Sequence, residues 1–199
     1  GGVKALKDVS FKVIAGEIHA LVGENGAGKS TLVKILSGAY KKETGEIKID
    51  GKPVQINNTQ IGKKLGIRNI YQEFALVPDL TVAENIFLDS FIVKYGIIQW
   101  PELYKKARKV IKNIGFDIDP KVLVKNLSVA YQQVVGICKA LSEEAKVLIL
   151  DEPTSVLSPD EVELLFTVLK KLKQEGMSII YISHKLEEIF KIAVTSTKD

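Results

Sequence analysis

The sequence has a single cysteine, no long apolar run and no signal-like start, and each absence excludes a class of protein. Cys138 stands alone among 199 residues, which excludes an intramolecular disulfide framework and fits a reducing compartment. No apolar stretch reaches the ~18 residues of a membrane-spanning helix. The N-terminal region also lacks a charged segment followed by an apolar core. We therefore expect no membrane span and find no indication of export.

Composition and charge carry no extreme value either. Hydrophobic residues make up 46% and charged residues 26%, which excludes disordered and collagen-like chains. The net charge of +4, from 28 basic and 24 acidic residues, indicates a solvated lysine-rich surface rather than a polyanion-binding face. There is no internal repeat and no low-complexity tract. At roughly 150 residues per domain the length gives about 1.3 domains, so we expect one domain, with or without an inserted subdomain.

Short apolar segments alternate with helical ones in the first and last thirds of the chain. We expect strands, in chain order, at residues 16–23, 45–50, 67–71, 146–151 and 177–183. Helices are expected at residues 29–37 and 158–174, the second opened by a capping box between Ser158 and Glu161. Apolar strands that alternate with helices are typical of a parallel sheet covered on both faces, so the fold class is α/β with a mainly parallel sheet.

The middle of the chain, residues 81–142, has few strand signals and a helical periodicity. Leu103, Ala107, Val110, Ile111 and Ile114 share one face of a helix expected at residues 101–115. A second helix is expected at residues 131–141. This helical stretch is predicted to be an insertion between two halves of the sheet.

Residues 23–30 (GENGAGKS) match the pattern G-x-x-x-x-G-K-[ST] of a phosphate-binding loop. Gly23, Gly26 and Gly28 let the backbone curl so that its N–H groups point at phosphate oxygens. In this chemistry Lys29 reaches the β- and γ-phosphates and Ser30 offers its hydroxyl to Mg²⁺. The alternative is an ordinary glycine-rich turn, which the preceding apolar strand and the following helix disfavour.

Two strand ends in the last third carry candidate catalytic groups. Asp151 follows an apolar run, the form of a Walker-B element, and we assign it to magnesium. Glu152 follows at once, aimed differently by the turn at Pro153, and is assigned to polarising the attacking water. His184 ends the next strand, which should lie beside that of Asp151, so it is expected near a γ-phosphate. Gln72 is a weaker candidate for orienting water or magnesium.

In order along the chain, these motifs resemble an ABC-transporter ATPase cassette. The resemblance rests on residues 23–30, Gln72, residues 127–133 (LSVAYQQ), residues 151–158 (DEPTSVLS) and His184, and it covers essentially the whole chain. The stretches GENGAGKSTLVKILSG, YQEFALVPDLTVAENIFL and YISHKLEEIF are similar to the first cassette of ribose-, galactose- and xylose-type sugar importers. The second cassette of such proteins usually has a degenerate phosphate loop, and residues 23–30 are not degenerate.

The resemblance implies a P-loop NTPase core with a small N-terminal antiparallel β portion. It also implies an ATP-hydrolysing subunit that powers import of a solute, with a monosaccharide as the expected class. ATP and Mg²⁺ would be the ligands, and each matching residue would have a role. The phosphates would lie on Gly23, Glu24, Asn25, Gly26, Ala27, Gly28, Lys29, Ser30 and Thr31. The catalytic set would be Glu152, His184, Lys29 and Gln72, and the magnesium ligands Ser30, Gln72 and Asp151. The signature segment, which contacts the ATP of an opposite cassette, would be Leu127, Ser128, Val129, Ala130, Tyr131 and Gln132.

The resemblance also implies partners and a place in the cell. Two cassettes would pair head to tail with ATP between them, and a transmembrane permease subunit would dock near residues 74–85. A solute-binding protein would act indirectly, and no direct nucleic-acid partner is expected. Such a subunit lies at the cytoplasmic face of the membrane. We expect one cassette over residues 1–199, truncated at both ends, with an ATP-binding core (1–72 and 145–199) and a helical subdomain (73–144).

The sequence departs from the family pattern in three places, and two of them, Ala130 and the missing adenine-stacking aromatic, lead us to expect weak ATP hydrolysis. Ala130 replaces the usual signature glycine, and Tyr131 follows where Gln or Asp is common. An extra methyl group where backbone approaches phosphate weakens the composite site. The adenine-stacking aromatic of the family would precede the segment at residues 2–6, outside the given sequence. Residues 193–199 resemble a shortened form of the family's Asp-Arg-Val segment.

Other classes of function fit the sequence less well. A soluble ABC-type protein that acts on DNA or ribosomes remains an alternative, but Lys and Arg are dispersed and no heptad insertion is present. A GTPase is disfavoured because neither Asp-x-x-Gly nor [Asn/Thr]-Lys-x-Asp occurs. A small-molecule kinase would not need residues 127–133. The transported solute is not disclosed by the sequence.

Overall fold

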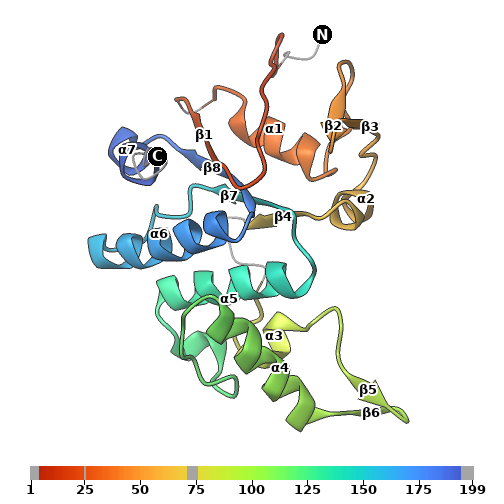
Figure 1. The fold of residues 1–199 in the computed structure, drawn as a ribbon, viewed down its shortest axis with the longest axis vertical. Helices are drawn as coiled ribbons and strands as arrows, with labels where there is room; N and C mark the ends of the chain where they lie inside the picture. Colours follow the sequence, from red (N-terminus) through yellow and green to blue (C-terminus); the bar gives the residue numbers. More distant parts are fainter. Residues whose placement is uncertain (1–4, 25, 71–75, 194–199) are drawn as a thin grey trace.

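A four-stranded parallel sheet forms the centre of the chain (Figure 1). The computed structural model describes residues 5–24, 26–70 and 76–193. In spatial order the strands are β1 (Ile18–Val22), β8 (Ser178–Ser183), β7 (Val147–Asp151) and β4 (Ile67–Ile70). Val22 pairs with Ser183, and Asp151 pairs with Ile182 on the other side of β8. The carboxyl ends of these strands therefore lie side by side at one edge of the sheet.

One face of the sheet is covered by the elements that follow β1 in the chain. These are α1 (Lys29–Leu36), α2 (Thr59–Lys64) and the antiparallel hairpin of β2 (Ile47–Ile49) and β3 (Lys52–Val54). Their buried cluster joins Val33 of α1 to Ile149 and Ile180 of the sheet. Gly38, with a φ of 80°, ends α1, because glycine adopts this left-handed conformation without strain.

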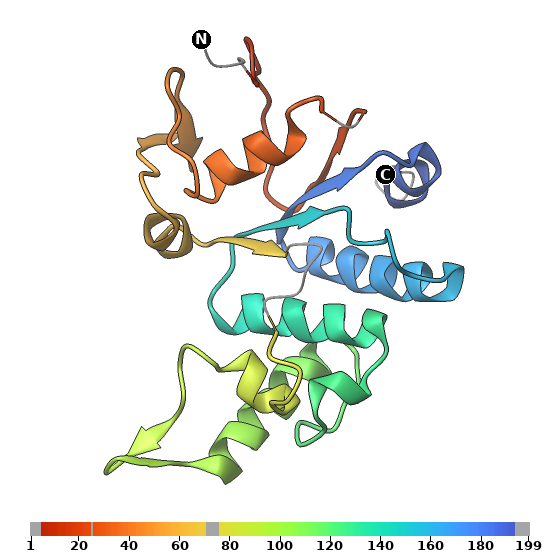
Figure 2. The same cartoon turned by 180° about the vertical axis from the view of Figure 1, so that it is seen from behind.

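The opposite face carries helices in two layers, which Figure 2 shows from behind. The helices are α6 (Pro159–Gln174) and α5 (Val129–Ser142) next to the sheet, then α3 (Val82–Ile86) and α4 (Trp100–Asn113), with a 3₁₀ turn at Val124–Asn126. One hydrophobic core runs from Leu103 of α4 through Val134 of α5 to Phe166 of α6 and Tyr181 of β8. The helical layers and the sheet are thus stabilised by one continuous core.

The predicted fold class is confirmed, and the differences are local. All five expected strands are present, and the helix expected at residues 131–141 begins earlier, at Val129, with Ser128 as its N-cap. The antiparallel hairpin of β5 (Val93–Lys94) and β6 (Ile97–Ile98) interrupts the segment expected to be helical. Its turn holds Tyr95 and Gly96 at φ values of 52° and 78°, which suit a tight hairpin. Strands of two residues are too short for an alternation signal.

Two further elements, α2 and α7 (Leu186–Ala193), are not among the expected helices. The short helix α3 is also absent from the expected elements, although its capping box between Thr81 and Glu84 is a recognisable signal. In the described part of the chain, no helix combines the length and the apolar character needed to cross a bilayer.

The capping box of α6 is expected to contribute measurably to stability. Ser158 Oγ accepts a hydrogen bond from the Glu161 N–H at 3.4 Å, and the Glu161 carboxylate accepts one from the Ser158 N–H at 3.1 Å. We expect Ser158→Ala to lower the free energy of unfolding by about 1 kcal/mol, measured by urea denaturation followed by circular dichroism. Thr167→Ala, on the exposed face of the same helix, is the control. Equal effects of the two substitutions would contradict the prediction.

Candidate nucleotide-binding site

The glycine-rich loop connects the end of β1 to the start of α1. Lys29 bends back over this loop, so that its ammonium group donates hydrogen bonds to the carbonyls of Gly23 at 2.5 Å and Glu24 at 2.9 Å. The Ala27 N–H donates to the Glu24 carbonyl at 3.2 Å and closes the turn. The loop therefore has the curled form expected of a phosphate cradle, with its lysine positioned over it. Asn25 lies outside the described residues.

Glycine is required at position 28 by both conformation and space. Gly28 has a φ of 89°, and a Cβ there would lie 2.5 Å from the Ala5 carbonyl oxygen and 2.8 Å from Leu6 Cδ2. No side chain caps the start of α1, and its first turn contains no acidic residue. The first N–H groups of a helix have no partner within the helix, so this end carries partial positive charge. This helix start suits an anion such as a phosphate.

Glu152 and His184 come together at the ends of β7 and β8, as the sequence predicts. Glu152 Oε1 lies 3.1 Å from His184 Nδ1. The Glu152 backbone has a φ of 47°, a left-handed conformation that is strained for this residue, and its N–H donates to the Ile182 carbonyl at 3.0 Å. The catalytic roles of the pair stay predictions.

Asp151 is partly buried at the end of β7 and suits a hard cation. Burial raises the pKa of its carboxyl group, and the neighbouring Glu152 charge raises it further, while Lys29 and Lys34 oppose this effect. An ionised Asp151 is therefore held at an electrostatic cost that a divalent cation would relieve. The chemistry of this carboxylate and of the Ser30 hydroxyl fits Mg²⁺. Gln72, the third predicted ligand, lies outside the described residues.

The signature segment begins α5, with Ser128 as its N-cap. The pKa of the Glu161 carboxyl group is lowered by the Ser158 N–H first, then by the Ser128 hydroxyl and the Ala130 N–H. The start of α5 therefore lies close to the Glu161 carboxylate. Tyr131 is 38% exposed and contacts Phe116 edge-on, with ring centroids 6.0 Å apart. The predicted contact of this segment with an opposite ATP stays a prediction.

Two buried polar residues beside the site were not singled out from the sequence. Gln133 of α5 is 4% exposed, and its side-chain amide donates to the Pro153 carbonyl. It thereby links the signature helix to the turn that carries Glu152. Glu188 of α7 is 7% exposed and contacts the same turn through Thr154. Both residues lie in stretches that carry the family resemblance, but a lone Gln or Glu gives no signal of burial.

The loop and the acidic strand end together define a P-loop protein of the α/β class. Comparison with known families gives the narrower assignment. The chain belongs to the ABC transporter family, whose sequence model matches residues 6–155. The resemblance to ABC cassettes found in the sequence is thereby confirmed.

Three curated relatives are named as sugar-import proteins. The arabinose import ATP-binding protein AraG of Pectobacterium atrosepticum is 52% identical over 200 residues, 100% of this chain and 39% of that protein. The xylose import ATP-binding protein XylG of Thermoanaerobacter pseudethanolicus is 54% identical over 98% of this chain and 39% of that protein. The ribose import ATP-binding protein RbsA 1 of Rubrobacter xylanophilus is 49% identical over 100% of this chain and 40% of that protein. The chain thus spans well under half the length of these relatives.

Solved structures agree with the fold. The structure of cbiO1 from Clostridium perfringens, described as part of an ABC transporter complex, superposes with a TM-score of 0.81 at 29% identity, over 94% of this chain and 75% of that one. An ATP-binding cassette described as a dimer in a post-hydrolysis state, bound to ADP and Pi, gives a TM-score of 0.74 at 28% identity. The match covers 92% of this chain and 82% of that one.

Proposed function

We propose that this chain binds ATP with Mg²⁺ and hydrolyses it, as an ATP-binding cassette that powers import of a monosaccharide. The observation that carries the proposal is the convergence of three features at one sheet edge. These are the phosphate-type loop with Lys29, the Asp151 carboxylate, and the Glu152–His184 pair at 3.1 Å. The names of the relatives, which refer to arabinose, xylose and ribose import, support a pentose or related sugar as the solute.

We assign a role to each of these residues from its chemistry and from its place in the family motifs. The loop N–H groups and the start of α1 hold the phosphates, and Lys29 exchanges its loop carbonyls for phosphate oxygens. Ser30 and Asp151 would hold Mg²⁺, which would neutralise phosphate charge. Glu152 accepts a hydrogen bond from the attacking water, and His184 keeps that carboxylate oriented. We propose Gln72 as the third magnesium ligand and as a residue that orients the attacking water.

We also propose that a cavity of about 230 Å³ beside β4 receives a segment of the permease subunit. It lies between the proposed core (1–72 and 145–199) and the proposed helical subdomain (73–144), and it is lined by Ser37, Lys63, Arg68, Asn69, Gly136 and Lys139, among others. Within the part of the chain that the structure describes, the Oδ1 and Nδ2 atoms of Asn69 are buried in the cavity wall without a hydrogen-bond partner. The lining also includes Glu143, and Arg68 and Lys63 are paired with Glu143 and Asp89, so most of the positive charge of the cavity wall is neutralised within the chain.

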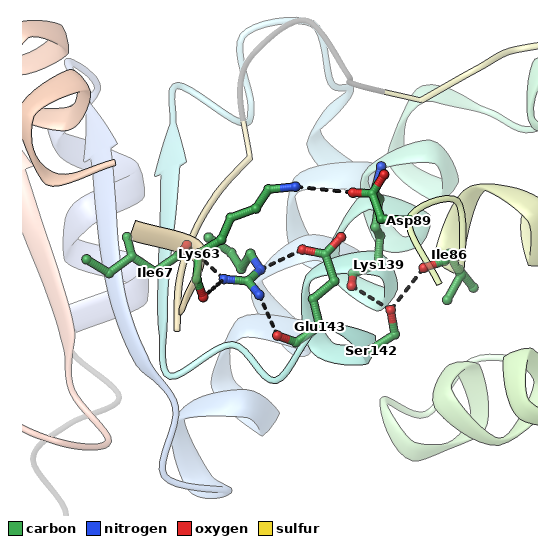
Figure 3. Close-up of polar contacts among 8 residues, drawn as sticks. Lys63, Ile67, Ile86, Asp89, Lys139, Ser142 and Glu143 are labelled. Carbon is green, nitrogen blue, oxygen red and sulfur yellow. Dashed lines mark hydrogen bonds and ion pairs between the residues drawn. The ribbon is translucent and has the colours of Figure 1, made fainter. Parts of the chain in front are cut away.

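An ion-pair cluster fixes the two walls of this cavity relative to each other (Figure 3). Arg68 of β4 donates to the Glu143 carboxylate at 2.6 Å and to the Glu143 carbonyl at 2.5 Å, at the end of α5. Lys63 of α2 pairs with Asp89 at 3.1 Å. The Arg68 and Glu143 side chains are only 12% and 14% exposed, so water screens their attraction weakly. A permease segment docked in this cavity would therefore contact β4 and α5, which the Arg68–Glu143 pair holds together.

The remaining assignments concern partners and location. The signature segment of a second cassette would complete the nucleotide site of this chain. In the same way, residues 127–132 of this chain would complete the site of the second cassette. A solute-binding protein would act through the permease, at the far side of the membrane. The cassette itself would lie at the cytoplasmic face.

Phosphate release from Mg·ATP tests the proposed activity. We expect the chain to bind ATP and to release labelled phosphate slowly, with release abolished by EDTA. Absence of ATP binding, a preference for GTP, or transfer of the label to a sugar would overturn the proposal. Salt-sensitive retention on DNA or RNA would favour the soluble, non-transport alternative. Uptake of labelled arabinose, xylose and ribose by the complete transporter in proteoliposomes tests the import step.

A further inference from the structure

Glu188 is a buried carboxylate on α7 that accepts three side-chain hydrogen bonds at a single oxygen. Its Oε2 accepts from Thr154 Oγ1 at 2.7 Å, from the Tyr181 hydroxyl at 2.9 Å and from Ser183 Oγ at 3.0 Å. The other oxygen, Oε1, lies 3.0 Å from Lys185 Nζ. A carboxylate this buried is costly unless its hydrogen-bonding capacity is satisfied, and here it is.

The charge state of Glu188 agrees with this arrangement. Burial alone raises the pKa of its carboxyl group, but hydrogen bonds from Thr154, Lys185, Tyr181 and Ser183 outweigh it and lower the pKa below its ordinary value. Glu188 is therefore ionised near neutral pH, and each hydroxyl acts as the donor. Charge-assisted hydrogen bonds of this kind are roughly twice as strong as neutral ones.

Two of the donors belong to the segments that carry the proposed catalytic pair. Thr154 lies two residues after Glu152, and Ser183 immediately precedes His184. Ser183 Oγ also accepts the Lys185 N–H at 3.0 Å, which closes the chain around His184. One carboxylate therefore ties together the β7 turn and the end of β8.

The Glu152 turn needs such support because its backbone is strained. A left-handed conformation in a glutamate costs free energy and persists only where the surroundings hold it. Gln133 holds the Pro153 carbonyl from the side of α5, and Glu188 holds Thr154 from the side of α7. The distance between Glu152 and His184 thus depends on anchors outside the pair.

We propose that Glu188 is a positioning residue for ATP hydrolysis, which sets the spacing of Glu152 and His184 through Thr154 and Ser183. The proposal rests on the proposed function. It assigns to α7 a part in the chemistry, although Glu188 lies on neither the phosphate loop nor the signature segment.

The test is Glu188→Gln in the chain or complete transporter that hydrolyses Mg·ATP. Glutamine keeps the shape, but its amide oxygen is a weaker acceptor for the three hydroxyls and its NH₂ group faces donors. We expect kcat to fall roughly 10- to 100-fold, because small displacements of reacting groups cost this much, while KM for ATP changes less than about twofold. Glu187→Gln, the exposed neighbour on the same helix, is the matched control and should leave kcat unchanged.

Two further measurements separate positioning from mere structural support. In a Glu152→Gln background, single-turnover rates should show little additional loss from Glu188→Gln, because both changes act on the same step. Thr154→Val removes one donor and leaves Glu188 in place, and it should lower kcat in the same way. This variant provides the test if Glu188→Gln fails to fold.

The outcomes are distinguishable from failure of the proposed function. A wild-type chain without ATP binding or hydrolysis overturns that function. An active wild type with kcat of Glu188→Gln within twofold overturns the role of Glu188 alone. Parallel loss of kcat, ATP affinity and urea midpoint, or full additivity with Glu152→Gln, also overturns it.

Discussion

Glu152→Gln is expected to lower ATP hydrolysis by at least about 100-fold while ATP stays bound, because general-base assistance contributes roughly 10²- to 10⁴-fold to such reactions. The glutamine amide can still contact His184, which lies 3.1 Å from the carboxylate, but it cannot accept a proton from water. The measurements are phosphate release under single turnover and retention of labelled ATP during gel filtration. With hydrolysis blocked, we also expect ATP-dependent pairing of two chains, visible as a shift in elution volume.

Glu144→Gln is the matched control for this substitution. Glu144 precedes β7 and also has a left-handed backbone, with a φ of 58° compared with 47° for Glu152. It is exposed and lies at the opposite end of the strand from the site. The control should hydrolyse ATP at the wild-type rate. A Glu152→Gln chain that neither retains ATP nor pairs would count heavily against the assignment.

Lys29→Met is expected to weaken ATP binding roughly 10- to 150-fold, because hydrogen bonds to charged groups contribute about 1.5–3 kcal/mol. The Lys29 ammonium group donates hydrogen bonds to the Gly23 and Glu24 carbonyls, so it lies directly over the phosphate-type loop. Methionine keeps the length of the side chain and removes the charge. Equilibrium titration with a fluorescent ATP analogue measures the loss.

Lys34→Met controls for the general loss of positive charge near the site. Lys34 lies on the same helix, and like Lys29 it lowers the pKa of Asp151, but its ammonium group lies over the Tyr40 ring, 5.1 Å from the centroid. We expect the dissociation constant of the Lys34→Met variant for ATP to stay within about threefold of the wild-type value. Similar losses in both variants would assign the effect to net charge rather than to a specific contact.

Most of the fold could be predicted because the strands are short, apolar and separated by clear turn residues. Residues 146–151 and 177–183 read as buried strands, and the structure pairs them in a parallel sheet. The β5–β6 hairpin could not be predicted, since its strands of two residues leave no periodic signal. Likewise α2, of six residues, is too short for a strong amphipathic pattern. The eight residues of α7 do form an amphipathic helix, but they are not among the expected helices.

The sequence by itself determined the glycine-rich loop, the acidic strand end and the histidine, because each depends on residue types at fixed spacing along the chain. Only the tertiary structure decided that Glu188 belongs with them. A glutamate next to another glutamate on a short helix reads as solvent-exposed, and its burial depends on α7 lying against β1 and β8. The three hydroxyls that satisfy its charge come from two strand ends at least 27 residues apart in the chain, Thr154 on one side and Tyr181 and Ser183 on the other. Local patterns record spacing along the chain, whereas a buried carboxylate is stabilised by partners that only folding brings within reach.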